Sequence, residues 1–310
     1  MVEENTSRGT SYNKDITVED VFAQYLQKAK NTLKERSYIT EESSVKKVRE
    51  YLEMRGLTYA RLVTPVTVQE FISYRKVTLT HLHKPPSNYT INHNILSLKR
   101  AFTLAYNNGL IAKNPLDSVE RIRFDKEDTP RILSREDVAI IEEIAKGRVI
   151  EGVVFLLVRT GLRLRELIAL EVNDICLEKN VIIVRSRKAK SRRTRYVPVV
   201  GKVRDFLLGL VGDAQECGRE VLFVNSKGNR LEANNVWQRF RYVLRKAEER
   251  GVDIRGVNVH TLRKTFISYM IMSGQDPAKV MRIVGHRNWE TMRKYLYLQE
   301  DYLRDIPEIF

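Results

Sequence analysis

Residues 160–170 read TGLRLRELIAL, and this stretch is the first of several motifs that together indicate the fold. The apolar run at residues 153–158 predicts a helix that ends at Gly161, because glycine readily adopts the backbone conformation of a helix end. A new helix is expected to begin at Arg163. Arg163 and Glu166 are three residues apart, so they share one face of that helix. The sequence therefore predicts an arginine beside a carboxylate, with a surface ion pair worth at most about 1 kcal/mol as the alternative.

Other polar residues follow in short motifs downstream. Lys190 lies in a basic run before YVPV, His260 and Arg263 belong to HTLRKTF, and Tyr295 comes nine residues after His286 of VGH. A tyrosine that attacks phosphorus needs cations around the non-bridging oxygens, because negative charge builds up there. A guanidinium can hold two phosphate oxygens, and a lysine with a lowered pKa can protonate the leaving oxygen. With the first arginine, this set predicts a site that breaks and rejoins a phosphodiester bond through a tyrosine.

The order and spacing of these motifs resemble the tyrosine recombinase (phage integrase) family. In that family an arginine follows a TGLR turn, a lysine lies in a β-hairpin that ends in a VP-type strand, and HxxR and GH precede the nucleophile. The lysine seven residues before Val197 is Lys190, and the spacing from the GH pair selects Tyr295 over Tyr297. The resemblance is strong over residues 131–297 and weaker in the N-terminal third. The ordered set is far more specific than any single motif.

The resemblance implies a role for each residue of the site. The arginines would bind the scissile phosphate, His260 would accept the proton of the tyrosine, and His286 would donate a hydrogen bond to the phosphate. Glu166 would orient the first arginine. Free tyrosine has a pKa of about 10, so attack near neutral pH needs a base or electrostatic help. The catalytic residues expected from the resemblance are Arg163, Lys190, His260, Arg263, His286 and Tyr295.

The chain departs from the family pattern at two places. Lys264 stands where the family very often has a second histidine, although that histidine is not in the central catalytic group. Arg287, Asn288 and Trp289 replace small polar residues of the commoner pattern between the GH pair and the tyrosine. These departures bear on the subfamily more than on activity.

At 310 residues, the chain has room for two domains. The patterns and the resemblance predict a mainly α fold with a small antiparallel β-sheet: a helical core-binding domain plus a mixed α/β catalytic domain of the tyrosine recombinase type. We expect a disordered tail over residues 1–15, the core-binding domain over 16–117, a linker over 118–131 and the catalytic domain over 132–310. The resemblance implies that the apolar C-terminal tail is exchanged between protomers, with packing in cis as the alternative.

In the first domain, apolar residues recur at helical spacing. They predict helices around residues 18–26 and 45–52 and a third over 68–77, for which Thr67 is the expected cap. A long helix should begin near Asn88, after two prolines, and end at an Asn-Asn-Gly sequence.

In the second domain, Ser134 is expected to cap the first helix. The pattern then changes to strands over residues 181–199, with a basic turn between them. A helix over residues 236–249 is expected to bury Trp237. Gly285 should end one helix, and the nucleophile should lie on the next.

The charge of the chain favours a polyanionic partner. Lys and Arg number 54 against 39 Asp and Glu, which gives a net charge of +15 and a pI near 9.7. Residues 185–195 contain seven basic residues and no acid. Such a run is usually a solvated face, and on a hairpin it would enter a DNA groove. The expected DNA-binding residues are Lys99 and Arg100 of the long helix, and Arg187, Lys188, Arg192 and Arg193 of the basic run.

Several other features are expected to be absent. No apolar run reaches the about 18 residues of a spanning helix, and the polar N-terminus is unlike a signal peptide. Cys176 and Cys217 offer neither a disulfide framework nor a metal-ligand pattern. We therefore expect a cytoplasmic, nucleoid-associated protein without membrane contact, metal or cofactor.

The resemblance implies a site-specific DNA recombinase that acts through a 3′-phosphotyrosine intermediate and a Holliday junction. It would work as a homotetramer on two sites in double-stranded DNA, with or without an accessory protein. Its role would be Xer-like resolution of multimers or integration and excision of a mobile element. The alternatives are a type IB topoisomerase-like relaxing enzyme and a catalytically silent DNA-binding accessory protein. A missing catalytic position would mark the silent protein, and the sequence lacks none.

Overall fold

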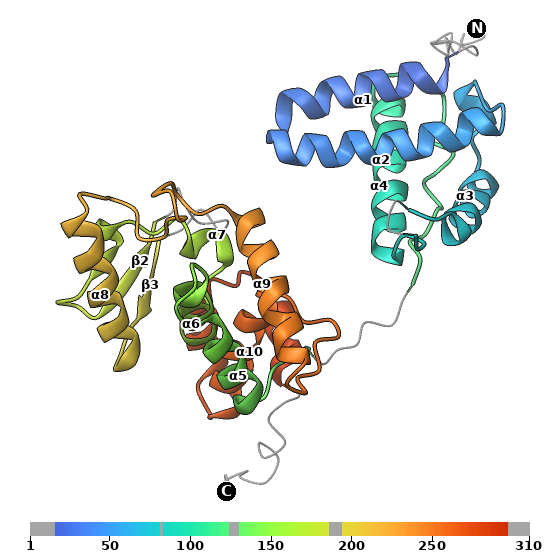
Figure 1. Ribbon diagram of the computed structural model, residues 1–310. Helices are drawn as coiled ribbons and strands as arrows, with labels where there is room; N and C mark the ends of the chain where they lie inside the picture. The colour runs from blue at the N-terminus through green and yellow to red at the C-terminus, as the bar shows by residue number, and fades with distance from the viewer. Residues whose placement is uncertain (1–15, 81–82, 124–129, 186–193, 297–310) are drawn as a thin grey trace, which may run out of the picture. The chain divides into compact units, whose positions relative to one another are not determined.

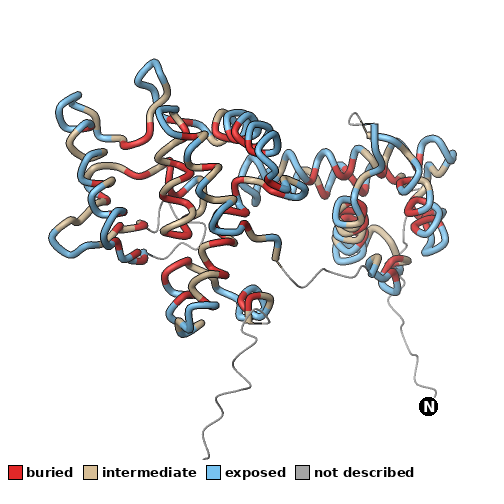
Figure 2. Tube along the Cα trace, turned by 60° about the horizontal axis from the view of Figure 1, so that its bottom comes forward, coloured by how far each residue is buried: buried red, intermediate tan, exposed pale blue. Residues whose placement is uncertain are grey.

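The computed structural model describes residues 16–80, 83–123, 130–185 and 194–296. The chain divides into two compact units, residues 1–126 and 127–310 (Figure 1). Each unit has its own hydrophobic core, and buried segments alternate with exposed ones along the helices of both (Figure 2). Outside the described residues lie the expected N-terminal and C-terminal tails and the predicted site residues Arg187, Lys188, Lys190, Arg192 and Arg193.

The first unit is helical in the part that the structure describes. The long fourth helix begins at Asn88 and ends at Asn107, so the prediction from the sequence is confirmed. It packs against the first two helices and buries Ile91, Ile95 and Phe102 fully. The elements are α1 (Val18–Thr32), α2 (Glu35–Met54), the 3-10 turn η1 (Ala60–Leu62), α3 (Pro65–Val77) and α4 (Asn88–Asn107).

The predicted cap of the third helix was wrong. Helix α3 begins at Pro65, and Thr64 is its N-cap. The Thr64 hydroxyl accepts a hydrogen bond from the backbone N–H of Thr67, and the Thr67 hydroxyl accepts one from the N–H of Thr64. A proline is well tolerated at the first helical position, because the N–H that it lacks would have no partner there. Thr67 is therefore the third residue of a reciprocal capping box.

The second unit combines helices with a small sheet, which confirms the predicted fold class. Its described strands form an antiparallel sheet in the order β1-β2-β3, with Val184 opposite Arg195. Helix α6 packs against α10, and α5 against α9 (Figure 1). The elements are α5 (Arg135–Ala145), α6 (Glu151–Thr160), α7 (Leu164–Leu167), η2 (Val172–Asp174), β1 (Ile175–Cys176), β2 (Val181–Val184), β3 (Arg195–Pro198), α8 (Lys202–Glu216), α9 (Ala233–Glu248), α10 (Val259–Met272), α11 (Pro277–Val284) and α12 (Trp289–Leu296).

Two local predictions in this unit have opposite outcomes. The cap at Ser134 is confirmed, since its hydroxyl accepts a hydrogen bond from the N–H of Asp137. The prediction that α9 buries Trp237 was wrong, because this side chain is 41% exposed. The buried stripe of α9 includes Val236 and Phe240, which are four residues apart. Trp237 directly follows Val236 of the stripe. Successive side chains of a helix point about 100° apart around its axis, so Trp237 points toward solvent.

Two glycines end the helices that lead into the predicted site. Gly161 ends α6 and Gly285 ends α11, both with left-handed backbone, at φ of 60° and 71°. A Cβ at Gly161 would overlap the ring of Phe266 on α10. Only glycine combines this backbone with so close an approach. The end of α6 is therefore held against α10.

Among the residues that the structure describes, no helix is both long and apolar enough to cross a membrane. No group of three or more His, Cys, Asp or Glu side chains is arranged there to hold a metal ion. Cys176 and Cys217 are free thiols.

A buried carboxylate joins three elements of the first unit. Glu41 of α2 is 5% exposed. Its carboxylate accepts hydrogen bonds of 2.7 Å from the hydroxyls of Tyr25 and Ser97 and from the guanidinium of Arg100. These partners come from α1 and α4, so one side chain connects the helices that form this core.

We predict that Glu41→Ala destabilises the first unit by roughly 2–4 kcal/mol, because two buried hydroxyls and a cation lose their acceptor. Urea unfolding followed by circular dichroism measures this loss. The matched control is Glu42→Ala, since Glu42 accepts a hydrogen bond from Tyr38 at the exposed surface of the same helix. That change should cost less than about 1 kcal/mol. Equal losses in the two variants would contradict the prediction.

Candidate active site

Arg163 and Glu166 form the contact that the sequence predicted. Arg163 is the N-cap of α7, and its backbone N–H donates to Glu166 Oε2 at 3.0 Å. Its guanidinium donates to Glu166 Oε1 at 2.9 Å and to the carbonyl of Gly285 at 2.8 Å. Glu166 is only 2% exposed. This burial excludes the alternative of a surface ion pair.

Arg263 lies on the first turns of α10 and is 1% exposed. Its guanidinium donates to the carbonyl of Gly161 at the end of α6 and, at 2.8 Å, to the carbonyl of Val284 at the end of α11. Its Nε has no partner among the described atoms. Burial lowers the pKa of Arg263, and the charge of Arg163 lowers it further. The ordinary arginine pKa is so high that the side chain remains a cation at neutral pH.

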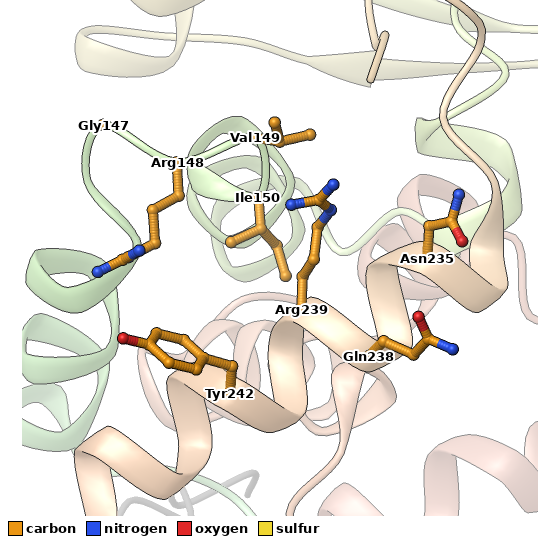
Figure 3. A pocket seen from close by; sticks show the side chains of 8 residues that line it. All are labelled: Gly147, Arg148, Val149, Ile150, Asn235, Gln238, Arg239 and Tyr242. Atoms are coloured by element: carbon orange, nitrogen blue, oxygen red, sulfur yellow. The ribbon is translucent and has the colours of Figure 1, made fainter. Parts of the chain in front are cut away.

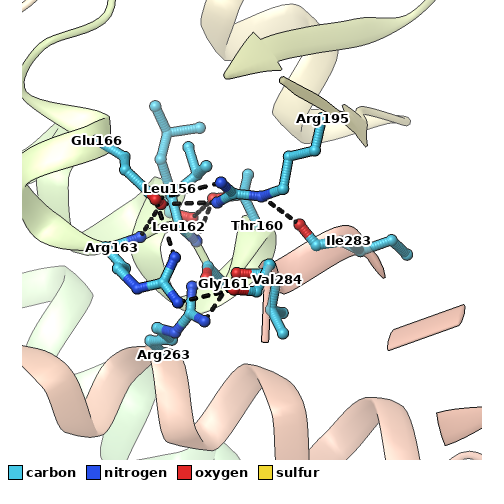
Figure 4. Close-up of polar contacts among 11 residues, drawn as sticks. Leu156, Thr160, Gly161, Leu162, Arg163, Glu166, Arg195, Arg263, Ile283 and Val284 are labelled. Carbon is cyan, nitrogen blue, oxygen red and sulfur yellow. Dashed lines mark hydrogen bonds and ion pairs between the residues drawn. The ribbon is translucent and has the colours of Figure 1, made fainter. Parts of the chain in front are cut away.

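Arg195 completes the cluster, and sequence reasoning missed it (Figure 4). Its guanidinium binds both oxygens of Glu166, at 3.2 Å and 2.6 Å, and its Nε donates to the carbonyl of Ile283 at 2.8 Å. The side chain is 8% exposed, whereas the basic run was expected to be solvated or to enter DNA. In β3, Arg195 and Val197 are buried while Tyr196 between them is exposed. This strand alternation was the signal that could have identified an inward-facing arginine.

Two histidines lie beside the arginines. Burial lowers the pKa of His286 to about 3, helped by the charges of Arg263 and Arg163. Its Nδ1 is 3.1 Å from the sulfur of Met292. Burial also lowers the pKa of His260, and the charge of Arg263 lowers it further. Because part of the His260 side chain is exposed, solvent screens some of this effect. Both imidazoles are therefore neutral at neutral pH.

Tyr295 lies on α12 and is 5% exposed. Burial raises the pKa of its phenol, and the nearby charge of Arg263 lowers it in part. The hydroxyl is therefore a neutral phenol at neutral pH. Arg163, Arg263, His260, His286, Tyr295 and Glu166 thus belong to one region of the second unit, built from α6, α7, α10, α11 and α12.

Lys99 and Arg100 lie on α4 in the first unit, where each has a partner inside the unit. Lys99 Nζ donates to the carbonyls of Asp117 and Val119, at 3.3 Å and 2.7 Å. Arg100 binds Glu41 and is about half exposed. Both side chains therefore support the fold of this unit, and their contact with DNA stays a prediction.

A pocket elsewhere in the second unit is lined by the turn at residues 147–150 and by α9 (Figure 3). The Arg148 guanidinium lies over the ring of Tyr242, with its central carbon 5.0 Å from the ring centroid. Arg239 projects from α9 toward Ile150. None of the predicted site residues lines this pocket. The candidate active site is therefore the arginine and histidine region described above.

Comparison with known proteins gives consistent results for both units. Residues 125–301 match the phage integrase family, and residues 17–122 match the phage integrase SAM-like domain. The chain is 23% identical to tyrosine recombinase XerC of Bacillus subtilis (strain 168) over 300 residues, covering 92% of this chain and 93% of the relative.

Solved structures of integrases have the same fold. The Tn1549 transposon integrase in complex with a circular intermediate DNA superposes with a TM-score of 0.74 at 21% identity, covering 91% of this chain and 95% of that one. A lambda integrase tetramer bound to a Holliday junction superposes with a TM-score of 0.70 at 16% identity, covering 89% and 79%.

We predict that His286 makes the stability of the second unit depend on pH. The unfolded side chain has a pKa of about 6.5, whereas the folded one has a pKa of about 3. As the pH falls below about 6.5, His286 becomes protonated in the unfolded state but stays neutral in the folded state. The free energy of unfolding therefore decreases with falling pH until the pH reaches the folded pKa. When the pH is lowered from about 7.5 to about 5.5, the free energy of unfolding of His286→Gln should therefore fall by about 1 kcal/mol less than that of the wild type.

Urea unfolding at the two pH values measures this difference. The control is His83→Gln, which changes an exposed histidine of the first unit and should leave the pH dependence of the second unit as in the wild type. Parallel losses in wild type and His286→Gln would contradict the prediction.

Proposed function

The chain belongs to the phage integrase family, and from this membership we propose that it is a site-specific DNA recombinase, which cleaves and rejoins DNA through a 3′-phosphotyrosine intermediate and a Holliday junction. The observation that carries the proposal is the position of Tyr295 in the same region as the partly exposed Arg163 and the buried Arg263, with Arg263 close enough to lower its pKa. A phenol among cations is suited to attack an anion.

The reaction follows from the charges of the site. Arg163 and Arg263 bind the non-bridging oxygens of the scissile phosphate and stabilise the charge that grows on them. His286, held neutral, donates a further hydrogen bond from a ring N–H.

The proton of Tyr295 must leave as the bond to phosphorus forms, because burial raises the pKa of the free hydroxyl. His260 is the proposed acceptor, and a neutral imidazole has the lone pair that this step needs. The 5′ oxygen then leaves and takes a proton, for which Lys190 is the proposed donor. Attack by a 5′ hydroxyl on the phosphotyrosine reverses these steps and joins the strands.

The phosphotyrosine bond conserves the energy of the phosphodiester bond that it replaces, so rejoining needs no nucleotide. Two pairs of strand exchanges on two DNA sites need four protomers. The relative described as a lambda integrase tetramer bound to a Holliday junction supports this assembly. The protein would act on DNA at the nucleoid, either as a Xer-like resolver of multimers or as the integrase of a mobile element.

DNA affinity should come mainly from salt-sensitive contacts with phosphates. The proposed contacts are made by Lys99, Arg100, Arg187, Lys188, Arg192 and Arg193. The net charge of +15 supports such contacts, since the duplex is a dense polyanion.

We predict that Tyr295→Phe abolishes covalent attachment to DNA, because it removes the attacking oxygen and little else. The experiment incubates labelled supercoiled and nicked DNA from the genetic neighbourhood of the protein with each variant in chelator, followed by denaturing gels. The matched control is Tyr297→Phe, which should still form the adduct. DNA affinity should change by less than about 3-fold in either variant.

Each result of this experiment separates the candidate functions. An adduct that persists in Tyr295→Phe and is lost in Tyr297→Phe would reassign the nucleophile. A wild-type adduct without sequence preference, with relaxation of supercoils by a monomer, would favour a type IB topoisomerase-like enzyme. DNA binding without any adduct on these substrates would favour a silent accessory protein.

The exchange of the C-terminal tail gives a separate prediction. Deleting residues 300–310 should impair tetramer formation on DNA more than binding of a single site, because the exchanged tail would link neighbouring protomers. Native gels with one and with two DNA sites measure both quantities. Deleting residues 1–15 serves as the control and should change neither. Unchanged tetramer formation after removal of the C-terminal tail would contradict the exchange.

A further inference from the structure

The end of α11 binds three arginines through three consecutive carbonyls (Figure 4). The last carbonyls of a helix have no partner within the helix and carry its negative partial charge. Each of these carbonyls accepts one hydrogen bond from a different guanidinium. The pairs are Ile283 with Arg195, Val284 with Arg263, and Gly285 with Arg163, each at 2.8 Å.

Arg195 differs from the other two arginines in how its nitrogens are used. All three nitrogens of the Arg195 guanidinium donate within the protein, two of them to Glu166 and one to the end of α11. Arg263 keeps its Nε without a described partner, and the side chain of Arg163 is 25% exposed. Every nitrogen of Arg195 is thus engaged within the protein, and the side chain is only 8% exposed, so Arg195 is placed to hold other groups rather than to bind a ligand.

Glu166 is the group through which Arg195 can act on Arg163. Its Oε1 accepts from both guanidinium groups, and its Oε2 accepts from Arg195 and from the backbone N–H of Arg163. A carboxylate has about four acceptor positions, and all four are used here. Without Arg195, two positions would be vacated, and Arg163 could turn toward them and away from a phosphate.

Loss of Arg195 would also reduce the positive charge beside the site. Arg163, Arg195 and Glu166 together carry a net charge of +1, because two cations surround one anion. Without Arg195 the remaining pair is neutral. With Arg263 included, the cluster would fall from +2 to +1, which weakens its attraction for an anion, since charges interact strongly where water is excluded.

Gly285 provides a second, independent observation. A Cβ at this position would lie 3.1 Å from the central guanidinium carbon of Arg195, tighter than ordinary contact. The glycine of the GH pair therefore serves the left-handed end of α11 and also leaves room for Arg195 beside it. The backbone here is fitted to this side chain.

We propose that Arg195 is a positioning residue for the strand-cleavage reaction: by binding Glu166 and the end of α11, it holds Arg163 toward the scissile phosphate and adds to the positive charge of the site. This inference rests on the proposed function, and Arg195 itself does not touch the substrate.

A second arginine, next to the same sheet, offers a matched control. Arg185, directly after β2, donates to the fully buried carboxylate of Asp174 at 2.6 Å and to the carbonyl of Asn173 at 2.9 Å. It thus has the same chemistry as Arg195, an arginine on a buried acid and a carbonyl. Its described hydrogen bonds include neither Glu166 nor α11.

The test compares the full-length wild type with Arg195→Gln, Arg195→Lys and Arg185→Gln on nicked DNA that traps the covalent adduct. The rate of adduct formation at saturating protein, the DNA affinity and the thermal unfolding midpoint are measured separately. We expect Arg195→Gln to react about 100-fold more slowly, because small misplacements of a catalytic group have effects of this size. Its DNA affinity should stay within about 3-fold of the wild type.

Arg195→Lys should recover part of the rate, since it restores the positive charge without the two-point contact. It also keeps the test valid if Arg195→Gln unfolds. Arg185→Gln should react within about 3-fold of the wild type, even if its stability falls as much.

A neutral methylphosphonate at the scissile position distinguishes positioning from general structural support. This substrate lacks one anionic oxygen, so it depends less on the arginines. The rate ratio between wild type and Arg195→Gln should therefore shrink on it, whereas a purely structural loss would leave the ratio unchanged and overturn the inference.

The remaining outcomes separate this inference from the proposed function. A wild-type adduct together with an unimpaired Arg195→Gln variant would overturn the inference alone, as would an equal loss of rate in Arg185→Gln. No adduct with the wild type would overturn the proposed function and the inference with it.

Discussion

The buried carboxylate of Glu166 is the contact on which the site depends. Burial by itself would raise its pKa, but the hydrogen bonds and charges of Arg195 and Arg163 outweigh that effect and lower it. A buried charge is tolerated only when it is paired and its acceptor positions are filled. Because its partners come from α7 and β3, this one ion fixes the position of the TGLR turn relative to the sheet.

The ends of two helices then organise the cations further. Arg263 bridges a carbonyl at the end of α6 and one at the end of α11. Arg163 and Arg195 also donate to carbonyls at the end of α11. Mutual repulsion of three guanidinium groups would spread them apart, but the negative helix ends and Glu166 offset it. The same positive field adds to burial in keeping His286 neutral. An anion that enters such a site meets cations already in place, so little reorganisation is needed at the moment of reaction.

Contacts between residues close together in the sequence could be predicted, whereas contacts between distant residues could not. The helices, the left-handed Gly161 and the contact between Arg163 and Glu166 follow from local spacing. Thr67 was misassigned as a cap because the helix already begins at Pro65. Trp237 was misassigned as buried because it directly follows a residue of the buried stripe. Arg195 could have been found from strand alternation, had the basic run not suggested solvent. Its carbonyl partner in α11 is 88 residues away, and backbone acceptors have no sequence signature.

The burial of Tyr295 constrains the proposed chemistry most strongly. Its raised pKa means that the phenolate is scarce at neutral pH, and an approaching phosphate brings negative charge that would make it scarcer still. Ionisation before attack is therefore unfavourable both without and with substrate. The proton must leave while the bond to phosphorus forms, when the charge passes from the phenol oxygen to phosphate oxygens that the arginines hold. The proposed base, His260, is neutral and partly exposed, which suits that timing, because such a base would take the proton only when the phenol oxygen is already bonding.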